Sequence, residues 1–159
     1  MKVLIVSDTH GYDDNMWTAI HREEPIDMLI HCGDIEHMPA ELEKYLHCPV
    51  HVVAGNNDFM FKLPEMKRID LCGHDVLVLH GHHYNIYREQ SALFYLAEDN
   101  QAEIVMFGHL HVPMVQTEGD ITIVNPGSMT YPRQEGGKPS YIVMTVTDED
   151  EPEYEIKYI

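Results

Sequence analysis

Short apolar runs recur along the first two thirds of the chain, and several segments between them have helical spacing. Five of the runs are nearly continuous in hydrophobic residues, which is typical of strands covered on both faces. These predicted strands occupy residues 2–6, 27–31, 50–54, 76–79 and 103–107. Helices are predicted at residues 15–23, 39–46 and 88–100. The second helix opens with Pro39, a residue suited to the first turn of a helix.

The pattern changes after residue 110. Strands joined by turns, with no helix between them, are predicted at residues 112–117, 120–124, 140–147 and 153–158. Gly119 and the pair Gly136-Gly137 mark two of the turns. An alternating first part followed by a β-rich last part predicts an α/β fold in which helices flank a packed pair of sheets. With 159 residues, 44% of them hydrophobic, we expect one domain spanning residues 1–159.

Charge narrows the classes of partner. The chain has 10 Lys and Arg against 27 Asp and Glu, a formal net charge of −17, which repels long nucleic acids and anionic membranes. Much of this acidity lies in residues 148–155, which we expect to form a solvated turn and strand edge. The N-terminal apolar run is too short for a signal peptide or a membrane span, so we expect a cytoplasmic protein. The widely spaced Cys32, Cys48 and Cys72 predict small buried residues rather than a disulfide framework or a zinc site.

Polar side chains follow five of the predicted strands, at the point where each strand ends. They are Asp8 and His10, then Asp34, then Asn56, Asn57 and Asp58, then His80 and His82, and last His109 and His111. Loops that leave the carboxyl ends of strands converge at one edge of an α/β sheet. We therefore expect these side chains to meet.

This mixture of carboxylate, amide and imidazole groups favours divalent Mn, Fe, Zn, Ni or Co. It offers more ligands than one ion needs, and one carboxylate can bridge two ions about 3.5–4 Å apart. Each motif alone has an ordinary explanation: Asp8 could cap a turn, and Asn56 could belong to a left-handed turn. Because five such coincidences at strand ends would be required, the metal site is the favoured interpretation.

The ordered set of motifs resembles the calcineurin-like metallophosphoesterase superfamily. Within it, the opening LIVSDTHG and the late Asn125-Pro-Gly-Ser128 are similar to the small bacterial and archaeal phosphodiesterases. The resemblance runs from Val3 to about Arg133. It implies a four-layer α/β/β/α sandwich, with two mixed sheets flanked by helices, and a binuclear metal centre.

The resemblance also implies roles for individual residues. A first metal would be held by Asp8, His10 and His111, a second by Asn56, His80 and His109, and Asp34 would bridge them. Leu110, between the last two histidines, is expected to point into the fold. The implied cofactor is two divalent ions, with Mn²⁺ favoured and Ni²⁺, Fe²⁺, Zn²⁺ or Co²⁺ as alternatives.

The implied activity is hydrolysis of small phosphodiesters by in-line attack of a hydroxide that bridges the two metals. Two divalent cations carry +4, two aspartates −2 and the hydroxide −1, which leaves about +1 to attract a phosphodiester monoanion. We expect no membrane partner and no long nucleic acid, whereas a short oligonucleotide or cyclic dinucleotide and a homo-oligomer stay open. Scaffold proteins with this fold exist, but all seven ligand positions here carry coordinating side chains, which favours an enzyme.

One position departs from the family pattern. Many members have a histidine, thought to protonate the leaving group, where this chain has Asn57. An amide donates hydrogen bonds but does not act as an acid, so we expect a preference for diesters with good leaving groups over alkyl monoesters. His82 could supply the proton instead, with a supporting or surface role equally open. Asn125–Ser128 is expected to form a structural turn near the metals, and Arg133 either contacts substrate or lies on the surface.

Overall fold

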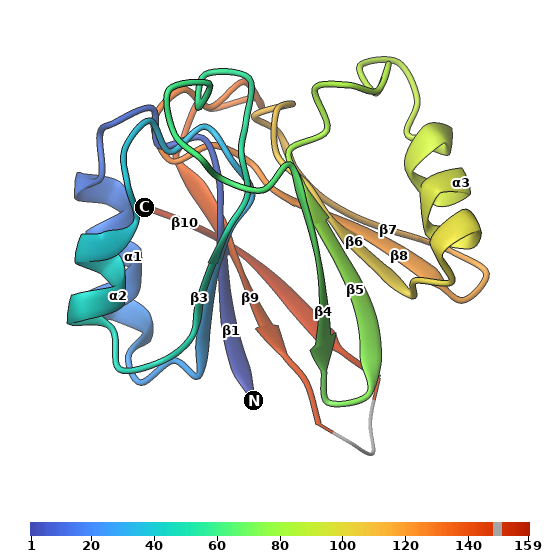
Figure 1. Ribbon diagram of the computed structural model, residues 1–159, viewed down its shortest axis with the longest axis horizontal. Coiled ribbons are helices and arrows are strands. Elements are labelled where there is room, and N and C mark those ends of the chain that lie inside the picture. The colour runs from blue at the N-terminus through green and yellow to red at the C-terminus, as the bar shows by residue number, and fades with distance from the viewer. Residues whose placement is uncertain (148–150) are drawn as a thin grey trace.

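The computed structural model describes residues 1–147 and 151–159, which form two packed sheets with helices on their outer faces (Figure 1). The helices are α1 (Asp14–Glu23), α2 (Ala40–Tyr45) and α3 (Ser91–Asn100). The first sheet contains β1 (Lys2–Val6), β2 (Met28–His31), β3 (Val50–Val52), β9 (Ser140–Thr145) and β10 (Glu153–Tyr158). The second contains β4 (Met66–Leu71), β5 (His74–Leu79), β6 (Ile104–Met106), β7 (Pro113–Glu118) and β8 (Ile121–Pro126).

Both sheets are mixed. The strand order is β10-β9-β1-β2-β3 in the first sheet and β4-β5-β6-β8-β7 in the second. The strands β1, β2 and β3 are parallel, as are β5, β6 and β8, and the remaining strands pair antiparallel beside them. In Figure 1, α1 and α2 cover the first sheet and α3 covers the second. This arrangement confirms the predicted α/β/β/α sandwich.

Three apolar layers fill the spaces between these elements. On β1, Val3 and Ile5 pack between the two sheets, whereas Leu4 and Val6 pack beneath α1 and α2. A third cluster, which includes Val105, lies between the second sheet and α3. Since successive side chains of a strand point to opposite faces, burial on both faces explains why the predicted strands are nearly continuous in hydrophobic residues.

Some sequence-based expectations were wrong in detail. The sequence pattern did not predict β4, an edge strand in which exposed and half-buried residues alternate. The third helix begins at Ser91 rather than at residue 88. Cys32 is buried as predicted, but Cys48 and Cys72 are only half-buried.

Two further observations concern the surface and the helices. Of the acidic segment 148–155, residues 148–150 lie outside the described residues, and Glu151, Glu153 and Glu155 are exposed around the start of β10. Among the residues that the structure describes, no helix has the length and apolar character needed to cross a bilayer.

Glu23 ties the end of α1 to the first sheet. Its carboxylate lies 2.9 Å from Lys2 Nζ and 3.0 Å from Lys157 Nζ, and it accepts a 3.0 Å hydrogen bond from the Tyr141 hydroxyl. Burial by itself raises the pKa of Glu23, but hydrogen bonds from Lys2, Lys157 and Tyr141 together lower the pKa below its usual value. The ionised carboxylate therefore stabilises the fold.

We expect Glu23→Gln to lower the free energy of unfolding at pH 7 by about 1.5–3 kcal/mol, the size of hydrogen bonds to a charged group. Because the pKa of Glu23 is lowered in the folded state, this stabilisation is present above the ordinary value of 4.5 and is lost as the pH falls through the folded-state pKa. Urea unfolding of both proteins at pH 7 and in acid measures the difference. The exposed neighbour Glu24 provides the control, and an equal loss in Glu24→Gln would contradict this account.

Candidate metal centre

Five loops meet at the edge of the sandwich where the parallel strands end, uppermost in Figure 1. They follow β1, β2, β3, β5 and β6. Five of the predicted ligands have positive φ, with values of +56° for Asp8, +48° for His10, +54° for Asp34, +65° for His109 and +60° for His111. Each such conformation costs on the order of 1–3 kcal/mol for a residue other than glycine, and such strain concentrates at functional sites.

The carboxylates of Asp8 and Asp34 lie at the centre of the loops and are almost fully buried. Asp8 Oδ1 is 3.0 Å from His111 Nε2, 3.8 Å from His10 Nε2 and 3.9 Å from His80 Nε2. Asp34 Oδ2 is 3.4 Å from His80 Nε2 and 3.9 Å from His10 Nε2. Two groups, Asp8 with His10 and His111 and Asp8 with Asp34 and His80, are compact enough for each to hold one ion.

Three of the histidines are oriented in the same way. Nδ1 lies 2.8 Å from the Cys32 carbonyl in His80, 2.7 Å from the Tyr131 carbonyl in His111 and 2.7 Å from Glu36 Oε1 in His10. Carbonyl and carboxylate oxygens accept hydrogen bonds, so Nδ1 carries a proton and Nε2 faces the two aspartates. Outer hydrogen bonds of this kind fix the tautomer of metal-binding histidines.

His109 is oriented the other way round. Its Nε2 lies 3.0 Å from the hydroxyl of Tyr87, so Nδ1 is the ring nitrogen that this contact leaves available. The ring is half-buried and lies 5.2 Å from the ring of His80, although His109 belongs to neither compact group. Its backbone N–H donates to Asp8 Oδ2. No sequence signal pointed to Tyr87, which comes from the loop after β5.

The turn after β3 holds Asp34 in place. The backbone N–H of Asn57 donates to Asp34 Oδ1 at 2.8 Å, and its side-chain amide donates to Asp34 Oδ2 at 2.7 Å. Asn56 is exposed in the same turn. Asp58 is buried and accepts hydrogen bonds from the backbone N–H groups of Glu36 and Gly55, both at 2.7 Å. Asp58 thus joins two loops, a role that the motif did not reveal.

The last predicted residues support the loops or line their edge. Asn125 donates to the Gly108 carbonyl and Ser128 donates to the Asp8 carbonyl, as expected for a structural turn. Arg133 is exposed, with Nη1 3.4 Å from the His109 carbonyl. Leu110 is buried beneath α3, as expected. His82 is half-buried, its ring 5.5 Å from that of His80 and its Nδ1 without a partner.

Opposing effects set the charges of this cluster. Burial raises the pKa of Asp8 and Asp34, but the neighbouring histidines, with Asn57 for Asp34, outweigh it and lower both below their usual values. Burial lowers the pKa of His80, but Asp34 and Asp8 raise it overall. Burial, followed by the charge of His80, lowers the pKa of His109 to about 4. Both carboxylates are therefore ionised at neutral pH.

The cluster fits a divalent metal. His10 Nε2 and His80 Nε2 are buried without hydrogen-bond partners, and each such atom costs about 1–3 kcal/mol unless something satisfies it. Buried carboxylate oxygens and imidazole nitrogens are the donor set of first-row divalent ions. The packing is also specific to glycine, because a Cβ atom on Gly55 would overlap the carboxylate of Asp34.

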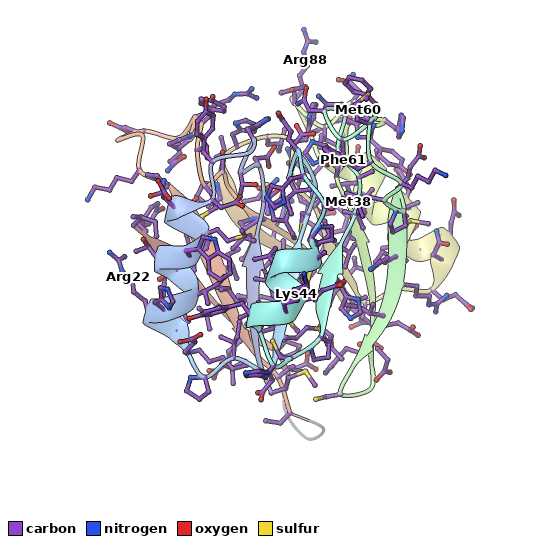
Figure 2. The ribbon with its side chains drawn as sticks, turned by 60° about the vertical axis from the view of Figure 1, so that its left-hand side comes forward. Arg22, Met38, Lys44, Met60, Phe61 and Arg88 are labelled. Carbon is purple, nitrogen blue, oxygen red and sulfur yellow. The ribbon has the colours of Figure 1, made fainter. Side chains whose placement is uncertain are left out.

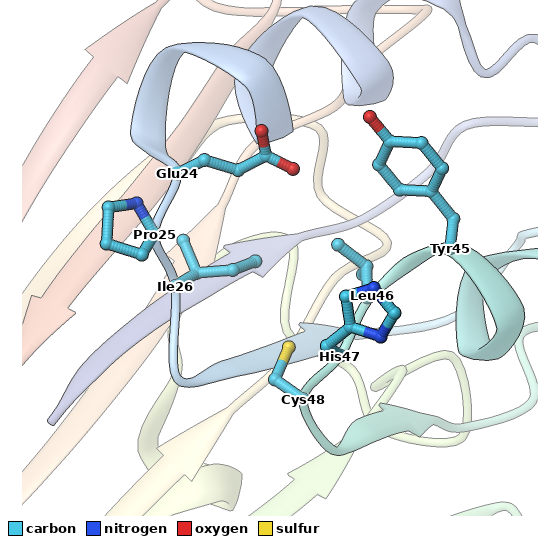
Figure 3. Close-up of a pocket in the computed structure, with 7 residues that line it drawn as sticks. All are labelled: Glu24, Pro25, Ile26, Tyr45, Leu46, His47 and Cys48. Atoms are coloured by element: carbon cyan, nitrogen blue, oxygen red, sulfur yellow. The ribbon is translucent and has the colours of Figure 1, made fainter.

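A cavity of about 490 Å³ lies away from the metal centre, at the amino ends of β2 and β3. Figure 3 shows its lining, with Glu24, Pro25 and Ile26 on one side and residues 45–48 on the other. It stands at the opposite end of these strands from the five loops and contains none of the predicted ligands.

Comparison with known proteins identifies the class. The model of the calcineurin-like phosphoesterase superfamily domain matches residues 1–149, and the chain belongs to this superfamily, as its motifs predicted. The probable metallophosphoesterase YsnB of Bacillus subtilis is 33% identical over 152 residues, which cover 94% of this chain and 86% of the relative. A phosphodiesterase of Methanocaldococcus jannaschii is 27% identical over 80% of this chain and 83% of its own.

Solved structures agree with this assignment. A predicted phosphoesterase from Streptococcus pneumoniae superposes with a TM-score of 0.82 and 29% identity, over 99% of this chain and 88% of the other. Vps29 from Entamoeba histolytica, solved in complex with Zn²⁺, superposes with a TM-score of 0.81 and 21% identity over 99% of both chains. At that identity, the second comparison shows the fold alone.

We expect a divalent cation to stabilise the protein, because it would satisfy the unpartnered imidazole nitrogens. Mn²⁺ at a hundred times its dissociation constant should add about 2.7 kcal/mol to the free energy of unfolding, measured as a rise in Tm relative to protein in EDTA. Asp34→Asn should lose most of the rise, whereas the exposed control Asp75→Asn should keep it. An undiminished rise in Asp34→Asn would be incompatible with this site.

Removing the Tyr87 hydroxyl should leave the imidazole ring of His109 less firmly positioned. We expect Tyr87→Phe to weaken the binding of Mn²⁺ about tenfold, at the lower end of the effect of outer-shell partners, in a calorimetric titration. Tyr95→Phe, on the exposed face of α3, is the matched control. Unchanged affinity in Tyr87→Phe would show that its hydroxyl does not position a ligand.

Proposed function

We propose that this chain is a metal-dependent phosphodiesterase that hydrolyses small phosphodiesters. The observation that carries the proposal is the buried pair of ionised carboxylates, Asp8 and Asp34, faced by the Nε2 atoms of three histidines. The family and the relatives named as phosphodiesterases support the reaction class. The superfamily is one of metal-dependent phosphoesterases, and the cluster has the donor atoms for that chemistry.

The proposed ligand sets are those that the motifs imply. Asp8, His10 and His111 would hold one ion, and Asn56, His80 and His109 the other. Asp34 would bridge the ions, because its Oδ2 lies between His10 and His80, one histidine of each set. When bound, two divalent ions, for which we propose Mn²⁺, would supply a bridging hydroxide for in-line attack and would neutralise charge on the phosphoryl oxygens.

The chain's own residues select the substrate. The exterior, with its net charge of −17, disfavours long polyanions and leaves small diesters that reach the loops. Neither Asn57, which stands at the family's acid position, nor His82, the alternative proton donor, is well suited to protonate a leaving group. The amide of Asn57 is bound to Asp34, and burial followed by the charge of His80 lowers the pKa of His82, which leaves it mostly neutral at pH 7. The leaving group must therefore depart without much help from an acid.

We expect the protein, loaded with Mn²⁺, to hydrolyse bis(4-nitrophenyl) phosphate on the order of 100-fold faster than glycerol phosphate, since general-acid assistance contributes about 10²–10⁴ where it exists. Release of nitrophenolate and of inorganic phosphate measures the two rates. Asp34→Asn should abolish both, and Asp75→Asn should abolish neither. Faster cleavage of the alkyl monoester would refute the substrate class, and bound metal without hydrolysis of either compound would favour a scaffold, the role that we consider second.

A further inference from the structure

A cavity of about 160 Å³ adjoins the metal centre, between the start of β4 and the loop after β5. Its main lining residues are Glu65, Met66, His80, His82, His83 and Tyr84. His80 is common to the cavity and the metal centre, since its ring lines the cavity while its Nε2 lies 3.4 Å from Asp34. A group bound in this cavity would therefore be separated from the metal centre by the ring of His80.

The size of the cavity limits what it can hold. A cavity of about 150 Å³ in another protein takes up one benzene molecule. A volume of about 160 Å³ therefore accommodates one six-membered ring.

The lining favours an aromatic ring. His82 and His83 have ring centroids 3.9 Å apart, and Tyr84 and Met66 add a phenol ring and a thioether. Aromatic and thioether side chains make favourable contacts with aromatic groups. Leu79 completes this side of the lining. In Figure 2, Met60 and Phe61 lie toward the top of the molecule, and Met38 lies nearer its middle.

One charged group lies in the lining of the cavity. Glu65 carries a negative charge into the lining, with its carboxylate 3.8 Å from His83 Nε2. A carboxylate in this position disfavours an anionic group, so the ring that fits is uncharged.

We propose that this cavity is the subsite for one ester arm of the substrate, and that the arm is an uncharged aromatic ring. The proposal deepens the proposed function and rests on it. Pyrimidine-like and phenol-like esters both belong to this class.

Two diesters with the same leaving group test the subsite. Phenyl 4-nitrophenyl phosphate and methyl 4-nitrophenyl phosphate both release nitrophenolate, and only the first has an aromatic ring as the arm that stays on phosphorus. We expect kcat/KM to be at least about tenfold higher for the phenyl ester, a typical gain for filling an apolar pocket. Met66→Trp, which fills the cavity from β4, should bring the ratio close to one. The control Val115→Trp, on the edge strand β7 at the far side of the same sheet, should keep the ratio of the natural sequence.

Binding without turnover separates this proposal from the proposed function. Phenylphosphonate should bind to the Mn²⁺-loaded protein about tenfold more tightly than methylphosphonate in calorimetry, and Met66→Trp should remove the difference. If the Met66→Trp protein does not fold, Tyr84→Ala, which removes one aromatic wall, should reduce the difference in affinity instead. If neither diester is cleaved, the proposed function fails, while the phosphonate affinities still decide the subsite. Equal affinities for the two phosphonates, or an unchanged preference in both cavity variants, would overturn the proposal.

Discussion

The burial of two negative charges, on Asp8 and Asp34, constrains much of the loop edge. Carboxylates taken out of water are costly unless cations or hydrogen-bond donors compensate them. Here they are compensated by protein donors on one side, from Ser7 and His109 to Asp8 and from Asn57 to Asp34. On the other side they face imidazoles whose Nε2 atoms point inward. That arrangement suits a positive ion, and it accompanies positive φ at several residues other than glycine.

The same constraint links the outer residues to the chemistry. Tyr131, Cys32 and Glu36 supply the oxygens that fix the tautomers of three histidines. Asp58 fixes the backbone of two loops, and Asn57 holds the shared carboxylate. With Asn57 occupied in this way, the site favours substrates that need little protonation. An aromatic arm seated beside His80 suits such a site, because it needs no charged contact on a strongly acidic protein.

The fold was readable from the sequence because its central strands are buried on both faces. Runs such as residues 2–6 are hydrophobic throughout, and the polar residues just after them mark the strand ends. Parallel strands bring those ends to one edge, so the sequence alone groups the candidate ligands. The edge strand β4 has charged and half-exposed residues, and nothing in its local pattern distinguished it from a loop. Tyr87 and Asp58 act through partners far away in the chain, which depend on loop conformations that local sequence does not encode.

A crystal structure of the protein grown with manganese tests the central claim most directly. The anomalous difference map should show two peaks about 3.5–4 Å apart, with the Asp34 carboxylate between them and the imidazoles of His80 and His111 on opposite sides. A map with no peak at Asp34, or with a single ion and the histidine rings turned away, would contradict the account.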